Sequence, residues 1–324
     1  MDYYQFGTTD FKVSPMGIGC MSMSGAYGPA DDDQSIATLH RAFDLGINFL
    51  DTSASYGSGH NHQLIARALK GRRERIYIHS KSGSPRTPDA SGIRGGGSPE
   101  YLTQNCEDSL KHLEIDELDV YCMSRVDPDV PIEESVGAMA RLVEQGKTRY
   151  IGLSEASPES IRRAQKVHPI VSLQFEYSLF ARDPEQGNID ACREFGMSLM
   201  AYGPLGHGFL TGNFGSPDAV PENRRKHPRY APGNFEQNLK LLSHLQEFAK
   251  EKSATTSQVA LAWLLAQGRD VIPIPSAKTI QHLEEDLGAL EVQLSKDDLA
   301  WLDSVFPYGA PAGDRSDQMD RLNR

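Results

Sequence analysis

INFLDTSASYG, residues 47–57, starts as a short apolar run and ends in small polar residues that lead into an amphipathic segment. Apolar runs of about four to eight residues bounded by turn signals are typical of strands buried on both faces of a parallel sheet. The chain therefore predicts an eight-stranded parallel sheet, with the strands PMGIGCM (15–21), INFLD (47–51), IYIHSK (76–81), LDVYCM (118–123), RYIGLS (149–154), IVSLQF (170–175), SLMAY (198–202) and VIPI (271–274).

Amphipathic segments with helix signals separate these strands. In SPEYLTQNCEDSLKHL (98–113), Ser98 is placed to cap a helix and Pro99 stands at its first position. TSQVALAWLLAQG (256–268) is apolar on nearly all sides and predicts a buried helix. Strand followed by helix, eight times in a chain of 324 residues, predicts a single α/β domain over residues 1–324 with the (β/α)8 TIM-barrel architecture.

The segment before the first strand, YQFGTTDFKV (4–13), predicts a hairpin that covers the bottom of the barrel. An open doubly wound sheet is the alternative fold, and it would bind a dinucleotide through a GxGxxG turn. Gly17 and Gly19 do not complete that motif, and the glycines at 95–97 lack the Lys-Ser/Thr of a phosphate loop. These observations favour the barrel.

Two connections are longer than is usual between strands and helices. One covers residues 82–100, after the third predicted strand, and the other runs from Gly203 to about Phe235, after the seventh. Both follow the carboxyl ends of strands, where barrel enzymes build their active sites. We expect a lid or cofactor clamp there, with a disordered insertion as the alternative. In the second loop, RRKHPR (224–229) is interpreted as solvated, with attraction of a phosphate-bearing cofactor as the alternative.

The charge balance of the chain is acidic. A formal net charge of −11 argues against nucleic acid or an anionic membrane surface as the main partner. No apolar run approaches the ~20 residues needed to cross a bilayer. The four cysteines lack zinc-like spacing and the ten histidines are scattered, so we predict no metal site. Because the start lacks the plan of a secretory signal, we expect a cytoplasmic protein with buried, reduced thiols.

Three polar residues stand at the ends of neighbouring predicted strands. Asp51 ends the second strand, Tyr56 follows five residues later, and Lys81 ends the third. Each alone has an ordinary explanation, namely a helix cap, a half-buried aromatic and a solvated lysine. Together they favour a proton donor for a developing alkoxide, because an adjacent ammonium stabilises a phenolate and lowers the pKa of the phenol, while a carboxylate holds the ammonium in place.

Several motifs, in order, resemble those of the aldo-keto reductase superfamily along almost the whole chain. They are DTSASYG, the lysine of HSKSG, LDVYxxxRVDP, GKTRYIGLSEAS, QFEYSLF, AYGPLGHGFLTG and IPIPSAKTIQHLEEDLGAL. The resemblance implies a (β/α)8 barrel that binds NADPH extended across its top, without a Rossmann motif. It also implies that Tyr56 is the general acid, that Lys81 tunes the pKa of Tyr56, and that Asp51 is the partner of Lys81.

The same resemblance implies a set of cofactor contacts. Ser154 and Gln174 would hydrogen-bond the nicotinamide carboxamide, and Tyr202 would stack on the ring. The remaining contacts would be Leu205, Gly206 and Gly208 along the pyrophosphate, Ser276, Lys278 and His282 at the 2′-phosphate, and Glu285 and Asp286 at the adenosine end.

Two of these positions depart from the family pattern. The usual arginine is His282 here, and the usual asparagine is Asp286. Both departures weaken the preference for a 2′-phosphate, but Lys278 still supplies a positive charge. The expected cofactor is therefore NADPH, with NADH as the alternative.

Ser124 stands where most of the family has a histidine that orients the substrate carbonyl. Loss of one such donor costs ~10²–10³ in rate, but a serine hydroxyl can donate directly or through a water and leaves room for a bulkier substrate. We therefore hypothesise an altered substrate and not an inactive enzyme. His79 is expected on the same side of its strand as Lys81 but deeper, and His60 and His62 are expected to be exposed or capping.

The expected activity is NAD(P)H-dependent reduction of an aldehyde or ketone, so the partner is a small-molecule carbonyl or alcohol. The serine before RVDP, with LSEASPESIRRA and EYSLFARD, resembles the pyridoxal reductase-like branch. Two alternatives are an alcohol or sugar dehydrogenase working oxidatively, and a cofactor-binding sensor similar to the potassium-channel β subunits. The tail from Pro307 to Arg324 either shapes the substrate pocket, as in the family, or is loose.

Overall fold

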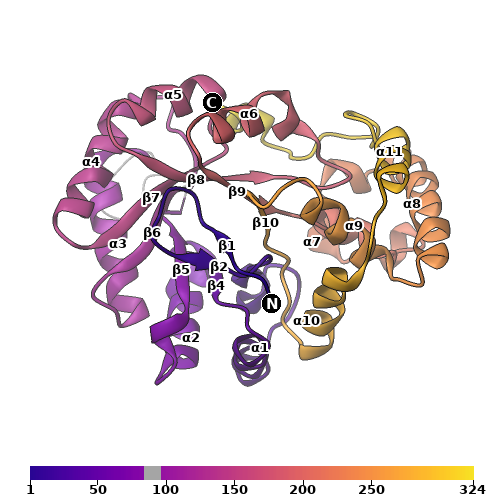
Figure 1. Cartoon of the computed structure of the whole chain (residues 1–324), viewed down its shortest axis with the longest axis horizontal. Coiled ribbons are helices and arrows are strands. Elements are labelled where there is room, and N and C mark those ends of the chain that lie inside the picture. Colours follow the sequence, from indigo (N-terminus) through magenta and orange to yellow (C-terminus); the bar gives the residue numbers. More distant parts are fainter. Residues whose placement is uncertain (84–95) are drawn as a thin grey trace.

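The sheet of this protein has the predicted topology (Figure 1). A computed structural model describes residues 1–83 and 96–324, so residues 84–95 of the first long loop lie outside the described residues. Eight parallel strands follow one another around the sheet in sequence order. The strands are β3 (Ile18–Gly19), β4 (Phe49–Ser53), β5 (Tyr77–Lys81), β6 (Leu118–Met123), β7 (Thr148–Ser154), β8 (Ile170–Glu176), β9 (Ser198–Tyr202) and β10 (Val271–Pro273).

Backbone hydrogen bonds join the first strand to the last. The N–H of Gly17 donates to the carbonyl oxygen of Pro273 at 3.0 Å, and the N–H of Gly19 donates to that of Pro275 at 2.9 Å. The sheet is thereby closed, and the (β/α)8 barrel predicted from the strand count is confirmed.

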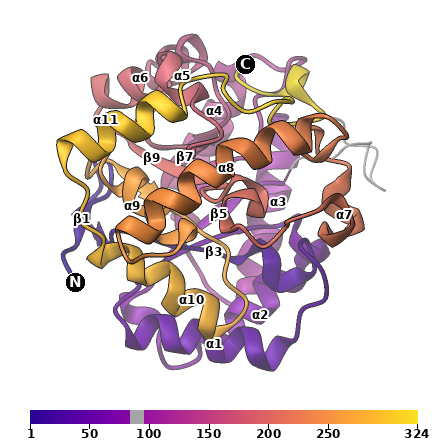
Figure 2. The same cartoon turned by 90° about the vertical axis from the view of Figure 1, so that its right-hand side faces the viewer.

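Helices cover the outside of the barrel (Figures 1 and 2). Ser98 caps α3 by accepting from the N–H of Tyr101, and Pro99 begins that helix, as predicted. The helix predicted from 256–268 is α9, which is buried along almost its whole length. The helices are α1 (Asp32–Asp44), α2 (His60–Leu69), α3 (Pro99–Leu113), α4 (Ile132–Glu144), α5 (Pro158–Gln165), α6 (Asn188–Glu194), α7 (Glu222–Arg225), α8 (Asn234–Glu251), α9 (Thr256–Leu265), α10 (Ile280–Leu287) and α11 (Lys296–Val305).

The predicted N-terminal hairpin is present as β1 (Tyr4–Gln5) paired antiparallel with β2 (Lys12–Val13). Its aromatic residues enter the barrel from the end opposite the long loops. The Phe6 ring lies 4.8 Å from that of Phe49 on β4, and the Phe11 ring stacks 4.1 Å from that of Tyr77 on β5. The hairpin therefore fills the bottom of the barrel with apolar surface, and a cavity lies at the other end, among the carboxyl ends of the strands.

The loop after β9 is folded over this other end of the barrel. It contains a turn of 3-10 helix over Gly206–Thr211 and the short helix α7 before α8 begins at Asn234. Residues from 203 to 227 line the cavity there, so this loop is not a disordered insertion, and its role as a lid or cofactor clamp stays a prediction.

The four cysteines are buried and free, as predicted. Across residues 1–83 and 96–324, no group of His, Cys, Asp and Glu side chains is arranged to hold a metal ion. Within the same residues, no helix combines the length and the apolar character that crossing a bilayer requires.

Candidate active site

A cavity of about 780 Å³ opens among the loops at the carboxyl ends of the strands. Three predicted site residues, Ser154, Gly206 and Lys278, do not line it. The predicted residues that do line it are Asp51, Tyr56, Lys81, Ser124, Gln174, Tyr202, Leu205, Gly208, Ser276, His282, Glu285 and Asp286.

The three strand-end residues singled out from the sequence meet at the base of this cavity. The Nζ atom of Lys81 lies 2.5 Å from Oδ2 of Asp51 and 5.0 Å from the centroid of the Tyr56 ring. Parallel pairing of β4 with β5 places Asp51 beside His79, one layer below Lys81. We call Asp51, Tyr56, His79 and Lys81 the lysine cluster.

Charge pairing keeps Asp51 and Lys81 ionised although both are buried. Burial opposes ionisation of the two groups, but the Lys81 ammonium and the His79 hydrogen bond outweigh it at Asp51 and hold the pKa of that carboxyl below its usual range. Burial likewise opposes the charge of Lys81, and the neighbouring Asp51 carboxylate raises the pKa of the ammonium above its usual value.

The pKa of Tyr56 differs from the sequence-based expectation of a lowered value. Burial raises the pKa of its phenol above 10, and the attraction of Lys81 opposes that rise without reversing it. Tyr56 therefore stays protonated throughout the neutral range. That is the state a proton donor must have before reaction, and the Lys81 ammonium would stabilise a phenolate at this position.

His79 lies on the same side of β5 as Lys81 and deeper, as predicted. Its Nδ1 atom is 3.1 Å from Oδ1 of Asp51 and its Nε2 atom is 3.3 Å from the Ser172 hydroxyl. Burial lowers the pKa of His79, so the ring is neutral at physiological pH. Gln174 donates from Nε2 to the same Asp51 oxygen at 2.6 Å, so the residue expected at the carboxamide also holds Asp51.

The expectation for the histidines of α2 is wrong in one case. His60 is half-buried and bonds Ser24 and Asp32. His62 is completely buried, with Nε2 at 3.0 Å from the Ser80 hydroxyl. The apolar face of α2 brings it against the outside of β5, which its isolated position in the sequence does not reveal. Neither ring lines the cavity.

Ser124 follows β6 and lines the cavity with 8% of its surface exposed. Sequence reasoning missed its neighbour Arg125, which also lines the cavity. The Arg125 guanidinium donates to the Ser124 carbonyl at 2.6 Å and to the Ser154 hydroxyl at 3.2 Å. In the described part of the chain, no carboxylate forms an ion pair with it. The signal in the sequence that could have identified Arg125 as a site residue is its position two residues after the end of β6.

The turn expected to hold the pyrophosphate is a tight left-handed one. Gly206, His207 and Gly208 have φ values of +56°, +54° and +93°, a region in which glycine is not strained. A Cβ atom on Gly208 would lie 2.1 Å from an Nη atom of Arg224. Glycine at this position therefore lets the Arg224 guanidinium approach the backbone, where it bonds the His207 carbonyl at 3.1 Å.

The residues expected at the adenosine end lie on the β10–α10 loop and on α10. Ser276 donates to the Gly19 carbonyl at 2.7 Å, and Lys278 donates to the Pro29 carbonyl at 2.5 Å. His282, Glu285 and Asp286 project from α10 into the cavity wall. Burial, with a smaller contribution from Glu285, raises the pKa of Asp286 to about 8.

Comparison with known proteins identifies the architecture. Residues 15–306 match the profile of the Aldo/keto reductase family. This chain belongs to that family. The aldo-keto reductase yakc of Schizosaccharomyces pombe, whose name specifies NADP(+), is 44% identical over 290 residues, covering 87% of this chain and 85% of that protein.

Two solved structures extend the similarity to three dimensions. The glycerol dehydrogenase AKR11B4 from Gluconobacter oxydans matches with a TM-score of 0.84 at 26% identity, over 94% of each chain. An aldo/keto reductase from Klebsiella pneumoniae in complex with NADP and acetate matches with a TM-score of 0.75 at 27% identity, over 97% of this chain and 98% of that one.

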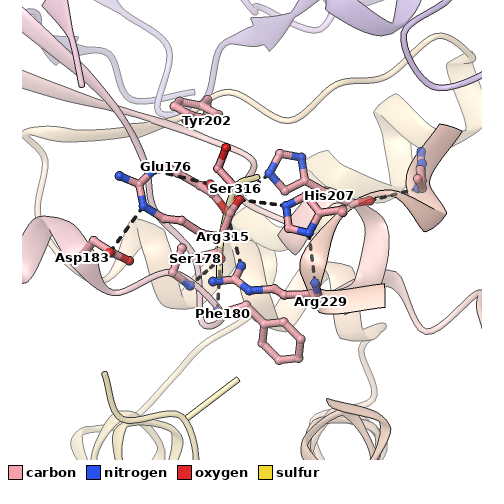
Figure 3. A network of polar contacts seen from close by, with 12 residues as sticks. Glu176, Ser178, Phe180, Asp183, Tyr202, His207, Arg229, Arg315 and Ser316 are labelled. Carbon is pink, nitrogen blue, oxygen red and sulfur yellow. Dashed lines mark hydrogen bonds and ion pairs between the residues drawn. The ribbon is translucent and has the colours of Figure 1, made fainter. Parts of the chain in front are cut away.

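This aldo/keto reductase has a second buried group of charges at the barrel mouth, which sequence reasoning missed. Arg315 pairs with Glu155, and Arg229 lies 3.4 Å from Glu176. The Tyr202 hydroxyl donates to Glu155 at 2.9 Å. Figure 3 shows Arg315 and Arg229 converging on Glu176 below Tyr202. We call Glu155, Glu176, Tyr202, Arg229 and Arg315 the arginine cluster.

Two expectations are settled by this cluster. RRKHPR (224–229) is not simply solvated, because Arg229 is 5% exposed and Arg224 packs over the Tyr27 ring at 4.6 Å. The C-terminal tail is not loose, because it carries Arg315 into the cluster. Residues 315–318, 321 and 322 line the cavity, so the tail shapes the pocket, the first of the two alternatives.

Proposed function

We propose that this aldo/keto reductase reduces an aldehyde or ketone with NADPH, and that Tyr56 is its proton donor. The observation that carries the proposal is the 2.5 Å contact of Lys81 with Asp51 beside the Tyr56 ring. A bound nicotinamide would supply the hydride that the carbonyl carbon accepts. Tyr56 gives its proton to the carbonyl oxygen, Lys81 stabilises the resulting phenolate, and Asp51 keeps Lys81 charged and in place.

The adenosine end supports NADPH over NADH. Ser276 and His282 line the cavity there and would hydrogen-bond a 2′-phosphate, and Lys278 would supply positive charge on leaving the Pro29 carbonyl that it contacts in this structure. Because the pKa of Asp286 is raised to about 8, most of this side chain is protonated at pH 7. The protonated Asp286 side chain adds no negative charge beside a phosphate. Its hydroxyl can donate a hydrogen bond, as the amide of the more usual asparagine would. The NADP(+) in the name of the S. pombe relative and the NADP in the K. pneumoniae structure agree with this preference.

The substrate end supports an aldehyde bulkier than a simple alkanal, with pyridoxal-like ring aldehydes as the leading candidates. By its resemblance to the family, Ser124 stands where a histidine is usual, and its side chain is smaller than an imidazole ring. Its hydroxyl and the adjacent Arg125 guanidinium offer donors to the carbonyl oxygen at the cavity wall. Within this proposal residues 1–324 act as one domain.

A second candidate is the oxidation of an alcohol or sugar by the same residues in reverse. The similarity to a glycerol dehydrogenase is the observation that favours it. In that direction the Tyr56 phenolate would accept the alcohol proton. Because the pKa of Tyr56 is raised, this activity would increase steeply toward alkaline pH.

The test is a panel of aldehydes, ketones, alcohols and sugars, pyridoxal included, assayed spectrophotometrically with NADPH, NADH, NADP+ and NAD+. We expect NADPH-dependent reduction to be the fastest reaction. Faster oxidation of an alcohol at neutral pH would replace this proposal by the second candidate, and tight nucleotide binding without turnover would identify a sensor.

Ser124→Ala tests the role of the hydroxyl on the best substrate. We expect turnover to fall ~10-fold or more, since a donor to the carbonyl oxygen is lost. Unchanged turnover on every accepted substrate would show that Ser124 serves only to enlarge the pocket.

A further inference from the structure

Arg315 is the most completely enclosed cation of the C-terminal tail. Only 2% of its side-chain surface is exposed. Its two Nη atoms donate to the two carboxylate oxygens of Glu155 at 2.9 and 2.6 Å, and its guanidinium lies 4.8 Å from the centroid of the Phe175 ring. Glu176 at 3.6 Å and Asp183 at 3.4 Å complete its surroundings (Figure 3). Such a planar, two-point pair fixes orientation as well as charge.

Glu155 transmits this orientation to Tyr202. It follows β7 in a left-handed conformation with φ of +53°, which a non-glycine residue adopts only where its contacts hold it. One of its oxygens, Oε1, accepts from the Tyr202 hydroxyl at 2.9 Å, from the Glu176 N–H at 3.2 Å and from Arg315. Arg315 and Tyr202 thus share one carboxylate oxygen.

The tail also holds Glu155 through its backbone. The N–H of Arg324 donates to the Glu155 carbonyl at 3.3 Å, and the N–H of Ser157 donates to the Arg324 carbonyl at 2.7 Å. Between these two anchors, at 315 and 324, the tail lines the cavity with Ser316, Asp317 and Gln318. The same segment therefore borders the cavity and fixes the residue that holds Tyr202.

We propose that Arg315 is a positioning residue, which sets the Tyr202 ring through Glu155 and thereby couples the C-terminal tail to binding of the nicotinamide. The inference rests on the proposed function in one respect, namely that Tyr202 is the surface on which the nicotinamide stacks. Without Arg315, Glu155 and Glu176 are two buried carboxylates with Arg229 as the remaining cation of the cluster, and water or a proton must compensate them. Whether water enters or a carboxylate takes up a proton, Glu155 no longer holds the Tyr202 hydroxyl in one fixed hydrogen bond. The lysine cluster lies on β4, on β5 and, with Tyr56, in the turn after β4, and it is left as it is.

The first test is Arg315→Met in the full chain, with NADPH binding measured directly by fluorescence titration. We expect the Kd for NADPH to rise ~10-fold and the KM for the carbonyl substrate to rise with it. The saturated kcat should stay within ~3-fold, because binding and not proton transfer is affected. Arg315→Lys, which keeps the charge and loses the second hydrogen bond, should recover most of the affinity. A folded Arg315→Met with unchanged Kd and KM would overturn the proposal.

The second test asks whether Arg315 acts through Tyr202. Tyr202→Phe keeps the stacking ring and removes its bond to Glu155, so adding Arg315→Met in that background should weaken NADPH binding by less than ~3-fold. A full, additive loss would show that Arg315 does not act through this hydroxyl. If Arg315→Met fails to fold, Arg315→Met with Glu155→Gln, which removes both charges of the pair, replaces it under the same criteria.

A third readout needs neither cofactor nor turnover. Trypsin cleavage after Arg321 should be ~10-fold faster in Arg315→Met than in the parent, because the tail loses its buried anchor. Arg163→Met is the matched control, since Arg163 makes an equally two-pronged pair with Glu133 in an exposed position away from the cavity. Equal cleavage rates for the parent and Arg315→Met would contradict the proposal. NADPH binding without carbonyl turnover by the parent would count against the proposed reaction and leave the Arg315 tests standing.

Discussion

The lysine cluster and the arginine cluster are two buried groups of charges at the same end of one barrel, built in different ways. The first takes its charges from adjacent strands, with Asp51 and Lys81 separated by 30 residues. The second closes between Glu155 and Arg315, which are 160 residues apart. Both balance their charges, as burial requires. Their geometry indicates different tasks, since one surrounds a phenol and the other holds an aromatic ring by its hydroxyl.

This difference shows that two buried ion pairs, each balancing its own charge, can serve different purposes: one can assist proton transfer and the other can fix the orientation of a side chain. Asp51 and Lys81 would act on a proton because Tyr56 lies directly against the ammonium. Glu155 and Arg315 would act on geometry because the shared carboxylate oxygen holds Tyr202. Substitutions in the two clusters should therefore give different kinetic results.

The largest expected effect is that of Tyr56→Phe. Removal of the proton donor should lower turnover ~10³-fold, while the Kd for NADPH stays within ~2-fold, because the ring is kept and the arginine cluster is untouched. Stopped-flow reduction of the best aldehyde and a parallel binding titration measure the two quantities. A loss of cofactor affinity as large as that expected for Arg315→Met would break the division between the clusters.

Lys81→Met should have the next largest effect on turnover. Burial already raises the pKa of Tyr56, and the Lys81 ammonium opposes that rise. Without the ammonium the pKa of Tyr56 would rise further, and the phenolate formed in the reaction would lose its stabilising charge. Turnover should fall ~10²-fold or more. Lys81→Met leaves the Asp51 carboxylate buried without its cationic partner, which can lower the stability of the fold. The double variant Lys81→Met with Asp51→Asn removes both charges and is therefore the control for stability. Full activity in either variant would show that Lys81 does not support proton transfer.

A smaller effect concerns His62, behind the lysine cluster. Burial lowers the pKa of this ring to about 3, from 6.5 for a free histidine. The unfolded chain therefore binds a proton below pH 6.5 that the folded protein does not, and stability falls as the pH drops through this window. The loss from this residue should be about 2 kcal/mol by pH 5. Urea unfolding at pH 7.5 and at pH 5 measures the free energy of unfolding at each pH. The decrease in this free energy between the two pH values should be smaller in His62→Gln than in the parent. An equal decrease in both proteins would exclude His62 as the cause.

The smallest effect is expected for Arg163→Met. Arg163 and Glu133 form a pair with bonds of 2.8 and 2.7 Å, as close as those of Arg315 and Glu155, but both side chains are 43% exposed. Water screens such a pair, so turnover and NADPH binding should be unchanged and Tm should shift by less than ~2 °C. A larger shift, measured by differential scanning fluorimetry, would show that pair geometry matters here more than burial.

The amino-acid sequence by itself determined the barrel, its N-terminal hairpin and the meeting of Asp51, Tyr56 and Lys81. The physical reason is local: apolar runs predict strands, consecutive parallel strands lie side by side, and residues at their carboxyl ends share one face. Only the tertiary structure decided the burial of His62, the raised pKa of Tyr56 and the pairing of Arg315 with Glu155. Those depend on how much water is excluded and on where a distant part of the chain returns, and neither is encoded in the spacing of nearby residues.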